Sequence, residues 1–335
     1  MGGFCSPEEE AIVEDKLGRR IDYLRISVTD RCNLRCLYCM PAEGVPSISH
    51  GEILSYEEII HFVHVGAQLG IRRLRLTGGE PLVRGGLTDL IRGLKAIPGI
   101  EELSLTSNGT LLAAQAGKLK AAGLDRINIS LDTLDKEKYA AITRCDCLGD
   151  AWAGIEAALE AGLAPVKINT VALRGINGDE LADIAALTLK YPLHVRFIEV
   201  MPLGDDVDWA CRHLLPLTEV KTRVETVGKL VPATVTGSGP AQVYRFAGGL
   251  GTVGFIAALS HNFCQYCNRL RLTADGKLKP CLASDLEVDV KGPLRSGADE
   301  EELQALYRRA LALKPSRHRL EQYQEHQRLM NQIGG

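Results

Sequence analysis

Residues 23–39 of this 335-residue chain read YLRISVTDRCNLRCLYC, a run that combines a strand pattern with a group of cysteines. In its first part, Leu24, Ile26 and Val28 alternate with polar residues, as expected of a β-strand with one apolar face. Its second part places three cysteines directly after that strand, at Cys32, Cys36 and Cys39. Parallel α/β proteins carry their chemistry in loops at the carboxyl ends of strands. We therefore expect the first strand to present these cysteines to a functional site.

The strand pattern of residues 23–29 recurs along the chain, with helical stretches in between. The further strand candidates are residues 72–77, 102–106, 126–131, 166–171 and 194–199. Between them, apolar residues recur at helical spacing in residues 56–69, 111–122, 151–161 and 179–190. Six alternating strand and helix units predict a parallel sheet, either open and doubly wound or rolled into a barrel.

The two faces of these strands favour the barrel. Strands buried on both faces of a parallel sheet are nearly continuous apolar runs, whereas each candidate here alternates apolar and polar residues. The apolar residues would face the covering helices. The polar face includes the basic residues Arg25, Arg75, Lys167 and Arg196. A packed barrel interior would not tolerate such a face, whereas an open, wet lumen that holds an anionic ligand would.

The pattern changes from about residue 202 onward. Gly- and Pro-rich stretches and short strand-like runs replace the regular units, and a helix is expected near residues 299–313. We predict an N-terminal extension over residues 1–20, a partial (β/α)6 TIM-type barrel over residues 21–215 and a smaller C-terminal region over residues 216–335.

Composition excludes several classes of protein. A net charge of −3 gives no overall attraction for nucleic acid, so any anion site must be a local group of Arg and Lys. The sequence contains no run of 18 apolar residues, so it predicts no membrane-spanning helix. Its acidic first residues lack the apolar core of a signal peptide. We expect a cytoplasmic protein, in which ten cysteines favour metal or cluster ligation over disulfides.

The first cysteine group, Cys32-x3-Cys36-x2-Cys39, has the ligands for an iron–sulfur cluster. A 4Fe–4S cube needs four anchors, so three cysteines leave one iron open to a substrate or cofactor. The alternative is structural zinc. Zinc also needs four ligands, and no fourth Cys or His at suitable spacing lies between residues 5 and 50.

A second group, Cys264-x2-Cys267-x13-Cys281, again has three cysteines. His261 could complete a Cys3His zinc site, which remains an alternative at this point. Arg269 and Arg271 are hard to explain around zinc, but they would suit an anionic ligand held at an open iron. The remaining cysteines lack such spacing, and we interpret them as ordinary thiols: Cys5, Cys145, Cys147 and Cys211.

The first group, with Tyr38 before its last cysteine, is similar to the hallmark of the radical S-adenosylmethionine (SAM) superfamily. The segment Thr77-Gly78-Gly79-Glu80-Pro81 looks like the motif of that superfamily that binds the SAM amino group. The second cysteine group, the segment from Cys264 to Arg271 and the terminal Gly334-Gly335 together resemble the GTP 3′,8-cyclase family of molybdenum cofactor biosynthesis. The resemblance runs from about Arg20 to Gly335.

This resemblance implies a lyase with two 4Fe–4S clusters, the second one across the mouth of the barrel. SAM would chelate the open iron of the first cluster, and its reductive cleavage would lead to removal of the C3′ hydrogen of GTP. The product would be 3′,8-cyclo-7,8-dihydro-GTP, which the following enzyme, cyclic pyranopterin monophosphate synthase, would convert. A flavodoxin- or ferredoxin-type protein would supply electrons, and a homodimer would be compatible with the family.

The resemblance also assigns residues. SAM would be met by Tyr38, Gly79, Ser130 and Met201. The triphosphate would be met by Arg25, Arg75, Thr106, Lys167, Arg196, Arg269 and Arg271. Guanine would bind the open iron of the second cluster, and Gly334 and Gly335 would enter the active site. One departure is local: Cys145 stands where family members usually have a second arginine.

Two other functions compete with this interpretation. A radical SAM enzyme with an auxiliary cluster could act on a peptide. It would need a peptide-binding platform and usually more cysteines near the C-terminus, and a basic lumen would have no role in it. The other alternative is a non-catalytic metal-binding or redox-sensing protein.

Overall fold

The computed structural model describes residues 14–203, 206–236, 239–261, 263–320 and 328–334. Its strands are β1 (Tyr23–Ser27), β2 (Arg73–Thr77), β3 (Glu102–Ser107), β4 (Arg126–Ser130), β5 (Val166–Ala172), β6 (Leu193–Glu199), β7 (Leu230–Pro232), β8 (Gln242–Phe246), β9 (Thr252–Ile256), β10 (Arg269–Leu272), β11 (Lys277–Lys279) and β12 (Val288–Asp289). Its α-helices are α1 (Tyr56–Gln68), α2 (Leu87–Lys95), α3 (Ala116–Ala121), α4 (Lys136–Thr143), α5 (Leu148–Glu160), α6 (Leu181–Lys190), α7 (Val207–Arg212), α8 (Leu217–Val224), α9 (Lys291–Arg295), α10 (Glu300–Ala312) and α11 (Met330–Ile333). The 3-10 helices are η1 (His50–Glu52), η2 (Pro81–Val83) and η3 (Cys264–Tyr266).

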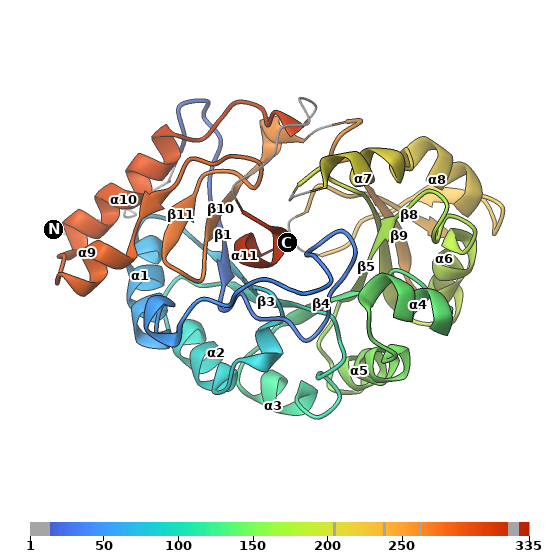
Figure 1. Cartoon of the computed structure of the whole chain (residues 1–335), viewed down its shortest axis with the longest axis horizontal. Helices are drawn as coiled ribbons and strands as arrows, with labels where there is room; N and C mark the ends of the chain where they lie inside the picture. The colour runs from blue at the N-terminus through green and yellow to red at the C-terminus, as the bar shows by residue number, and fades with distance from the viewer. Residues whose placement is uncertain (1–13, 204–205, 237–238, 262, 321–327, 335) are drawn as a thin grey trace, which may run out of the picture.

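All the strands belong to one sheet in the linear order β12-β11-β10-β1-β2-β3-β4-β5-β6-β9-β8-β7. Strands β1 to β6 are parallel neighbours in sequence order, as the six-unit prediction requires. The described strands curve as an open barrel, with helices such as α2, α3 and α5 on the outside (Figure 1). The predicted partial barrel is confirmed.

The C-terminal strands extend this barrel at both edges. Strand β10 pairs in parallel with β1, and β9 pairs in parallel with β6, so the barrel sheet gains a parallel strand on each side. The antiparallel strands β11 and β12 follow β10, while β8 and β7 follow β9. Short strand-like runs were visible in the sequence here, but the alternation of residues does not reveal which distant strand each one joins.

The register explains the two faces of the sheet. Leu24 lies opposite Leu74 and Leu270, and these side chains belong to the apolar core beneath the helices. Arg25 lies opposite Arg75 and Arg271 on the other face. One side of the predicted basic lumen therefore comes from the neighbouring strands β10, β1 and β2.

Helix α10 anchors the C-terminal region against the barrel. A capping box between Asp299 and Glu302 fixes its start. Tyr307 stacks on Phe62 of α1 at 4.3 Å between ring centroids, and its hydroxyl donates to the carbonyl oxygen of Phe62. A side chain at Gly66 would place Cβ 2.5 Å from the Tyr307 hydroxyl, so this close packing requires glycine. The end of α10 is thereby held in a fixed place.

Candidate functional site

The first cysteine loop follows β1 at the mouth of the barrel. Cys32, Cys36 and Cys39 are all partly buried. Burial raises the pKa of the Cys36 thiol well above its usual range, and the neighbouring Cys39 thiol raises it further. Burial and Cys32 likewise raise the pKa of Cys39 to about 12. The thiols lie close enough to influence one another, as ligands of one cluster must.

Arg144 holds this loop from outside. Its backbone is left-handed, at φ 58°, and no other non-glycine residue of the described chain has a positive φ. Its Nη1 atom donates to the carbonyl oxygen of Arg35 at 2.7 Å and to that of Met40 at 3.2 Å. The arginine retained next to Cys145 thus contacts the cysteine loop.

The Gly78-Gly79 pair packs against the same loop. A Cβ atom at Gly79 would lie 2.3 Å from the carbonyl oxygen of Arg31, and one at Gly78 would lie 2.3 Å from that of Thr29. The glycines therefore permit a close approach between two loops of the protein. Burial raises the pKa of Glu80 to about 7, and its carboxylate accepts hydrogen bonds from Ser107 and Asn108.

The second cysteine group lies beside the barrel mouth. Cys264, Cys267 and Cys281 line a cavity of about 80 Å³ together with Arg269, Arg271 and Met201. Burial opposes ionisation of the Cys267 thiol, but the Arg269 guanidinium and the Lys314 ammonium outweigh burial and lower its pKa to about 7. This cation-rich setting differs from that of the first group.

Neither group has the arrangement of a single-ion site. Among the described residues, no group of three or more His, Cys, Asp and Glu side chains is placed to hold a metal ion. His261, the proposed fourth zinc ligand, is exposed, whereas Cys264 is buried. Cluster ligands follow a different rule, because each cysteine of a cube binds a different iron.

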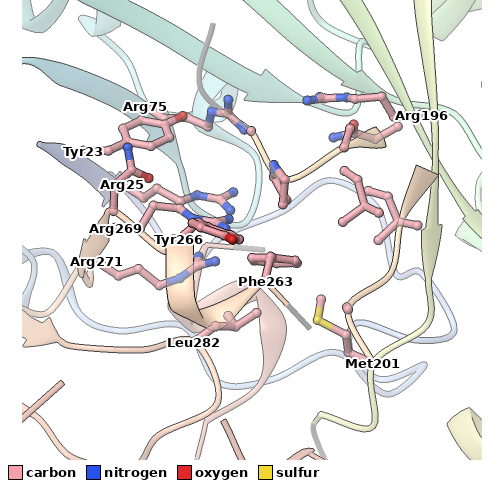
Figure 2. A pocket seen from close by; sticks show the side chains of 18 residues that line it. Tyr23, Arg25, Arg75, Arg196, Met201, Phe263, Tyr266, Arg269, Arg271 and Leu282 are labelled. Atoms are coloured by element: carbon pink, nitrogen blue, oxygen red, sulfur yellow. The ribbon is translucent and has the colours of Figure 1, made fainter. Parts of the chain in front are cut away.

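A larger cavity of about 520 Å³ lies in the lumen. In Figure 2, Arg25, Arg75, Arg269 and Arg271 lie on one side of it, and Arg196 and Met201 lie on the other. These arginines come from β1, β2, β6 and β10. Burial lowers the pKa of Arg196 to about 9, and Arg75 and Arg126 add to this effect. The lumen thus concentrates positive charge away from water.

Four of these basic side chains form no ion pair with the carboxylates that the structure describes. Within the described ranges, no carboxylate forms an ion pair with Arg75, Lys167, Arg196 or Arg271, whereas Arg126 pairs with Glu102. Among the described residues, three buried polar atoms of the cavity lining also lack a hydrogen-bond partner: Tyr23 OH, Asn169 Oδ1 and Arg196 Nε. A lumen built in this way suits a polyanionic ligand with further polar groups.

The structure separates some of the predicted site residues. Arg25, Arg75, Arg196, Arg269, Arg271 and Met201 line the lumen cavity, but Thr106, Lys167, Gly79 and Ser130 do not. Lys167 is buried and donates to the carbonyl oxygen of Thr236 at 2.8 Å. Tyr38, Cys39 and Met201 line a neighbouring cavity of about 300 Å³. Met201 therefore borders both spaces and the second cysteine group.

The sequence did not single out two residues that contact this site. Tyr23 lines the lumen and lies beneath Arg75, whose Cζ is 5.4 Å from the ring centroid. The position of Tyr23 on the polar face of the first strand could have indicated that it faces the lumen. Lys314 contacts Cys267 from a distant part of the chain, and no motif marked it.

The interpretation of Cys145 and Cys147 as ordinary thiols is wrong. The structure joins them in a disulfide, with Cα atoms 5.5 Å apart. This separation lies within the range that a disulfide requires, and two residues so close in sequence can reach it. The spacing in the sequence alone did not show that they do. Cys211 is a free, exposed thiol. Cys5 and Gly335 lie outside the described residues, whereas Gly334 is buried against Thr77.

Comparisons with known proteins cover nearly the whole chain. Residues 26–188 match the family model of the Radical SAM superfamily, and residues 193–320 match Molybdenum Cofactor Synthesis C. The chain is 54% identical over 325 residues to a GTP 3′,8-cyclase of Pelotomaculum thermopropionicum, covering 96% of this chain and 100% of the relative. It is also 54% identical over 324 residues to a GTP 3′,8-cyclase of Moorella thermoacetica, with coverage of 96% and 100%.

Solved structures share the fold. SuiB of Streptococcus suis bound to S-adenosylmethionine aligns with a TM-score of 0.60 and 13% identity, covering 86% of this chain and 68% of SuiB. SuiB bound to its precursor peptide SuiA aligns with a TM-score of 0.58 and 12% identity, with coverage of 93% and 73%. Within the described part of the chain, no helix combines the length and apolar character needed to cross a lipid bilayer.

Proposed function

This chain belongs to the GTP 3′,8-cyclase family of the radical SAM superfamily, and we propose that its reaction takes place in the lumen between the two cysteine groups. Its function is that of a GTP 3′,8-cyclase in molybdenum cofactor synthesis. The product would be 3′,8-cyclo-7,8-dihydro-GTP. A 4Fe–4S cluster with bound SAM supplies the one-electron chemistry of this family. The protein's own residues bind, orient and enclose the nucleotide.

Cys32, Cys36 and Cys39 would hold the cluster that binds SAM. Their partial burial and mutual influence support this assignment. SAM would extend from that cluster along Tyr38, Gly79, Ser130 and Met201. The cavity bordered by Tyr38, Cys39 and Met201 supports part of this path, since Met201 also borders the lumen.

Cys264, Cys267 and Cys281 would hold a second 4Fe–4S cluster with an open iron for guanine. The support is local: the small cavity at these cysteines shares Arg269, Arg271 and Met201 with the lumen. A nucleotide could therefore place its base at the second cysteine group and its phosphates on the arginines. No protein nitrogen or oxygen would need to act as a fourth ligand.

The triphosphate would lie against the arginines of the lumen. Arg25, Arg75, Arg196, Arg269 and Arg271 already face the cavity. Lys167 would join them only after leaving the Thr236 carbonyl, and Thr106 would offer its unpartnered hydroxyl. These groups would neutralise the charge on the substrate, and Gly334 and Gly335 would close the site from the C-terminal side.

Several finer assignments accompany this proposal. They are the lyase class, a flavodoxin- or ferredoxin-type reductant, transfer of the product to cyclic pyranopterin monophosphate synthase, a cytoplasmic location and a homodimer. The division at residues 20 and 215 also stays a prediction. A peptide substrate is not favoured, because the likeness to SuiB rests on 12–13% identity and shows the fold alone.

The observation that carries the proposal is the convergence of arginines from four strands on one cavity bordered by the second cysteine group. Equilibrium binding to the anaerobically reconstituted protein tests it. GTP should bind, and Arg75→Ala with Arg196→Ala should weaken its binding while SAM affinity stays unchanged. GTP binding that is unaffected by both substitutions would place the substrate elsewhere.

A further inference from the structure

Lys314 is a buried lysine two residues beyond the end of α10, with 2% of its surface exposed. Its Nζ atom lies 2.6 Å from the carbonyl oxygen of Arg269, 2.9 Å from that of Pro280 and 3.6 Å from Sγ of Cys267. An ammonium group has three N–H donors, so these acceptors use all of them. Among the described residues, no carboxylate forms an ion pair with Lys314.

The acceptors belong to two limbs of the second cysteine group, of which the first carries Cys264 and Cys267 and the second carries Cys281. Arg269 lies two residues after Cys267, and Pro280 directly precedes Cys281. The two limbs are joined through β10 and β11, whose pairing of Arg271 with Lys279 and of Leu272 with Leu278 stops short of Cys267 and Cys281. A single ammonium group thus ties together two loops that each carry a proposed cluster ligand.

The rest of the chain holds Lys314 in this place. Helix α10 is fixed against α1 by the stacking of Tyr307 on Phe62. Arg19 donates to the carbonyl oxygens of Pro315 and Cys264, at 2.8 and 2.7 Å. The segment that carries Lys314 is therefore fastened a second time to the limb that carries Cys264 and Cys267.

Burial of an ammonium group is costly unless negative charge lies nearby. The Nζ atom of Lys314 lies 3.6 Å from Sγ of Cys267, and the thiolate of that cysteine would supply negative charge when it binds a cluster. By contrast, the described contacts to Cys32 Sγ come from neutral groups, the backbone N–H of Leu34 at 3.4 Å and the side-chain amide of Asn108 at 4.0 Å.

We propose that Lys314 is a positioning residue of the second cluster, where its ammonium group joins the two cysteine limbs and offsets the negative charge of the cluster. This inference rests on the second cluster proposed above. A fixed cation beside a cluster stabilises its reduced state and raises its reduction potential. Loss of the cation should therefore lower that potential.

The experiment uses the full chain with Cys32→Ser, Cys36→Ser and Cys39→Ser, so that only the second cluster can assemble. About four irons per chain after anaerobic reconstitution establish that cluster. Absence of iron in this background overturns the second cluster itself, and the inference with it. That outcome differs from a cluster that is present but indifferent to Lys314.

Three substitutions are then compared in this background. Lys314→Met keeps the length without the charge, and Lys314→Arg keeps the charge. Lys279→Met is the matched control, because Lys279 is 1% exposed but pairs with Glu287. Thermal unfolding followed by circular dichroism shows whether each variant folds.

In a redox titration followed by electron paramagnetic resonance, Lys314→Met should lower the reduced-to-oxidised ratio at least tenfold, about 59 mV for one electron. In Lys314→Arg and Lys279→Met, the reduction potential of the second cluster should stay near that of the parent protein. If Lys314→Met loses its iron while Lys279→Met keeps it, the positioning role is supported directly. Full iron and an unchanged potential in Lys314→Met overturn the proposal, and so does equal iron loss in both methionine variants.

Discussion

The Nη1 atom of Arg271 donates a hydrogen bond of 2.6 Å to the carbonyl oxygen of Gly334, so the chain end contacts an arginine of the lumen. Asn331 reinforces this placement by donating from its side-chain amide to the carbonyl oxygen of Asp30 at 3.0 Å. Arg328 forms ion pairs with Asp275 and Glu287. Figure 1 shows α11 near the middle of the barrel mouth. The end of the described chain is packed into the site, unlike most chain termini.

Gly334→Ala should disturb catalysis without unfolding the protein. Gly334 has φ 68°, and a Cβ atom there would lie 2.4 Å from Cγ2 of Thr77. The tail must shift, and positioning errors of about 1 Å can cost roughly a hundredfold in rate. We expect slower cyclisation with unchanged SAM and GTP affinity, measured by product formation and equilibrium binding. Deletion of Gly334 and Gly335 should have the same effect.

A second substitution separates the clash from other causes. Thr77→Ser removes the methyl group that the new Cβ would meet, so Gly334→Ala with Thr77→Ser should recover part of the lost rate. Recovery would be incomplete, because alanine in a left-handed conformation still costs roughly 1–2 kcal/mol. A wild-type rate in Gly334→Ala alone would show that the tail has no catalytic role.

Arg75→Ala or Lys167→Ala should weaken GTP binding by about 1–3 kcal/mol, the usual scale for losing a charge-assisted hydrogen bond. SAM affinity should barely change, because both residues are assigned to the triphosphate. Lys138→Ala is a suitable control, since Lys138 pairs with Asp179 outside the lumen. Titrations that show equal losses for GTP and SAM would make the lumen residues structural.

GTP binding should depend on pH through Lys167. Burial, with repulsion from Arg126, Arg196 and Arg75, lowers the pKa of Lys167 to about 7. A bound triphosphate favours the charged amine and raises that pKa, so the complex holds more protons than the free protein above pH 7. Affinity should therefore fall as pH rises from about 7.5 to 9, by up to tenfold per unit.

This range lies above the titration of a terminal phosphate, near pH 6. Lys167→Arg should flatten the profile, because a guanidinium keeps its proton to a higher pH than an amine does. Isothermal titration in buffers of different ionisation enthalpy would count the protons taken up. A wild-type affinity that is constant over this range would rule out Lys167 as the titrating group.

The two cysteine groups should respond differently to serine, a poor ligand for iron. Cys32→Ser, Cys36→Ser or Cys39→Ser should eliminate formation of 5′-deoxyadenosine from SAM. Cys264→Ser, Cys267→Ser or Cys281→Ser should abolish GTP conversion but leave some uncoupled SAM cleavage. Chromatography of both products distinguishes these outcomes. Normal cyclisation in a second-group variant would show that this group does not hold the substrate.

Local patterns in the sequence predicted the features that depend on one strand or loop. Alternation of Arg25 with Leu24 and Ile26 was enough to place that arginine in the lumen. The cysteine spacings likewise predicted both groups as cluster ligands, which stays a prediction, whereas the identity of the family is confirmed by its relatives.

Features that join distant segments could not be predicted in this way. Lys314 contacts Cys267 across 47 residues, and its own neighbours in sequence carry no motif. The contact of Lys167 with Thr236 depends on a loop 69 residues away. The places of β9 and β10 at the barrel edges also follow from tertiary pairing, which periodicity does not encode.

The central claim is that this chain cyclises GTP in its lumen, and GTP carrying deuterium at C3′ tests it most directly. The anaerobically reconstituted protein is incubated with this substrate, SAM and a strong reductant, and both products are analysed by mass spectrometry. We predict deuterium in 5′-deoxyadenosine, and a cyclised nucleotide lighter than its substrate by the exchange of deuterium for hydrogen. Arg75→Ala with Arg196→Ala should greatly reduce both signals. Unlabelled 5′-deoxyadenosine together with unchanged GTP from fully reconstituted wild-type protein would contradict the account.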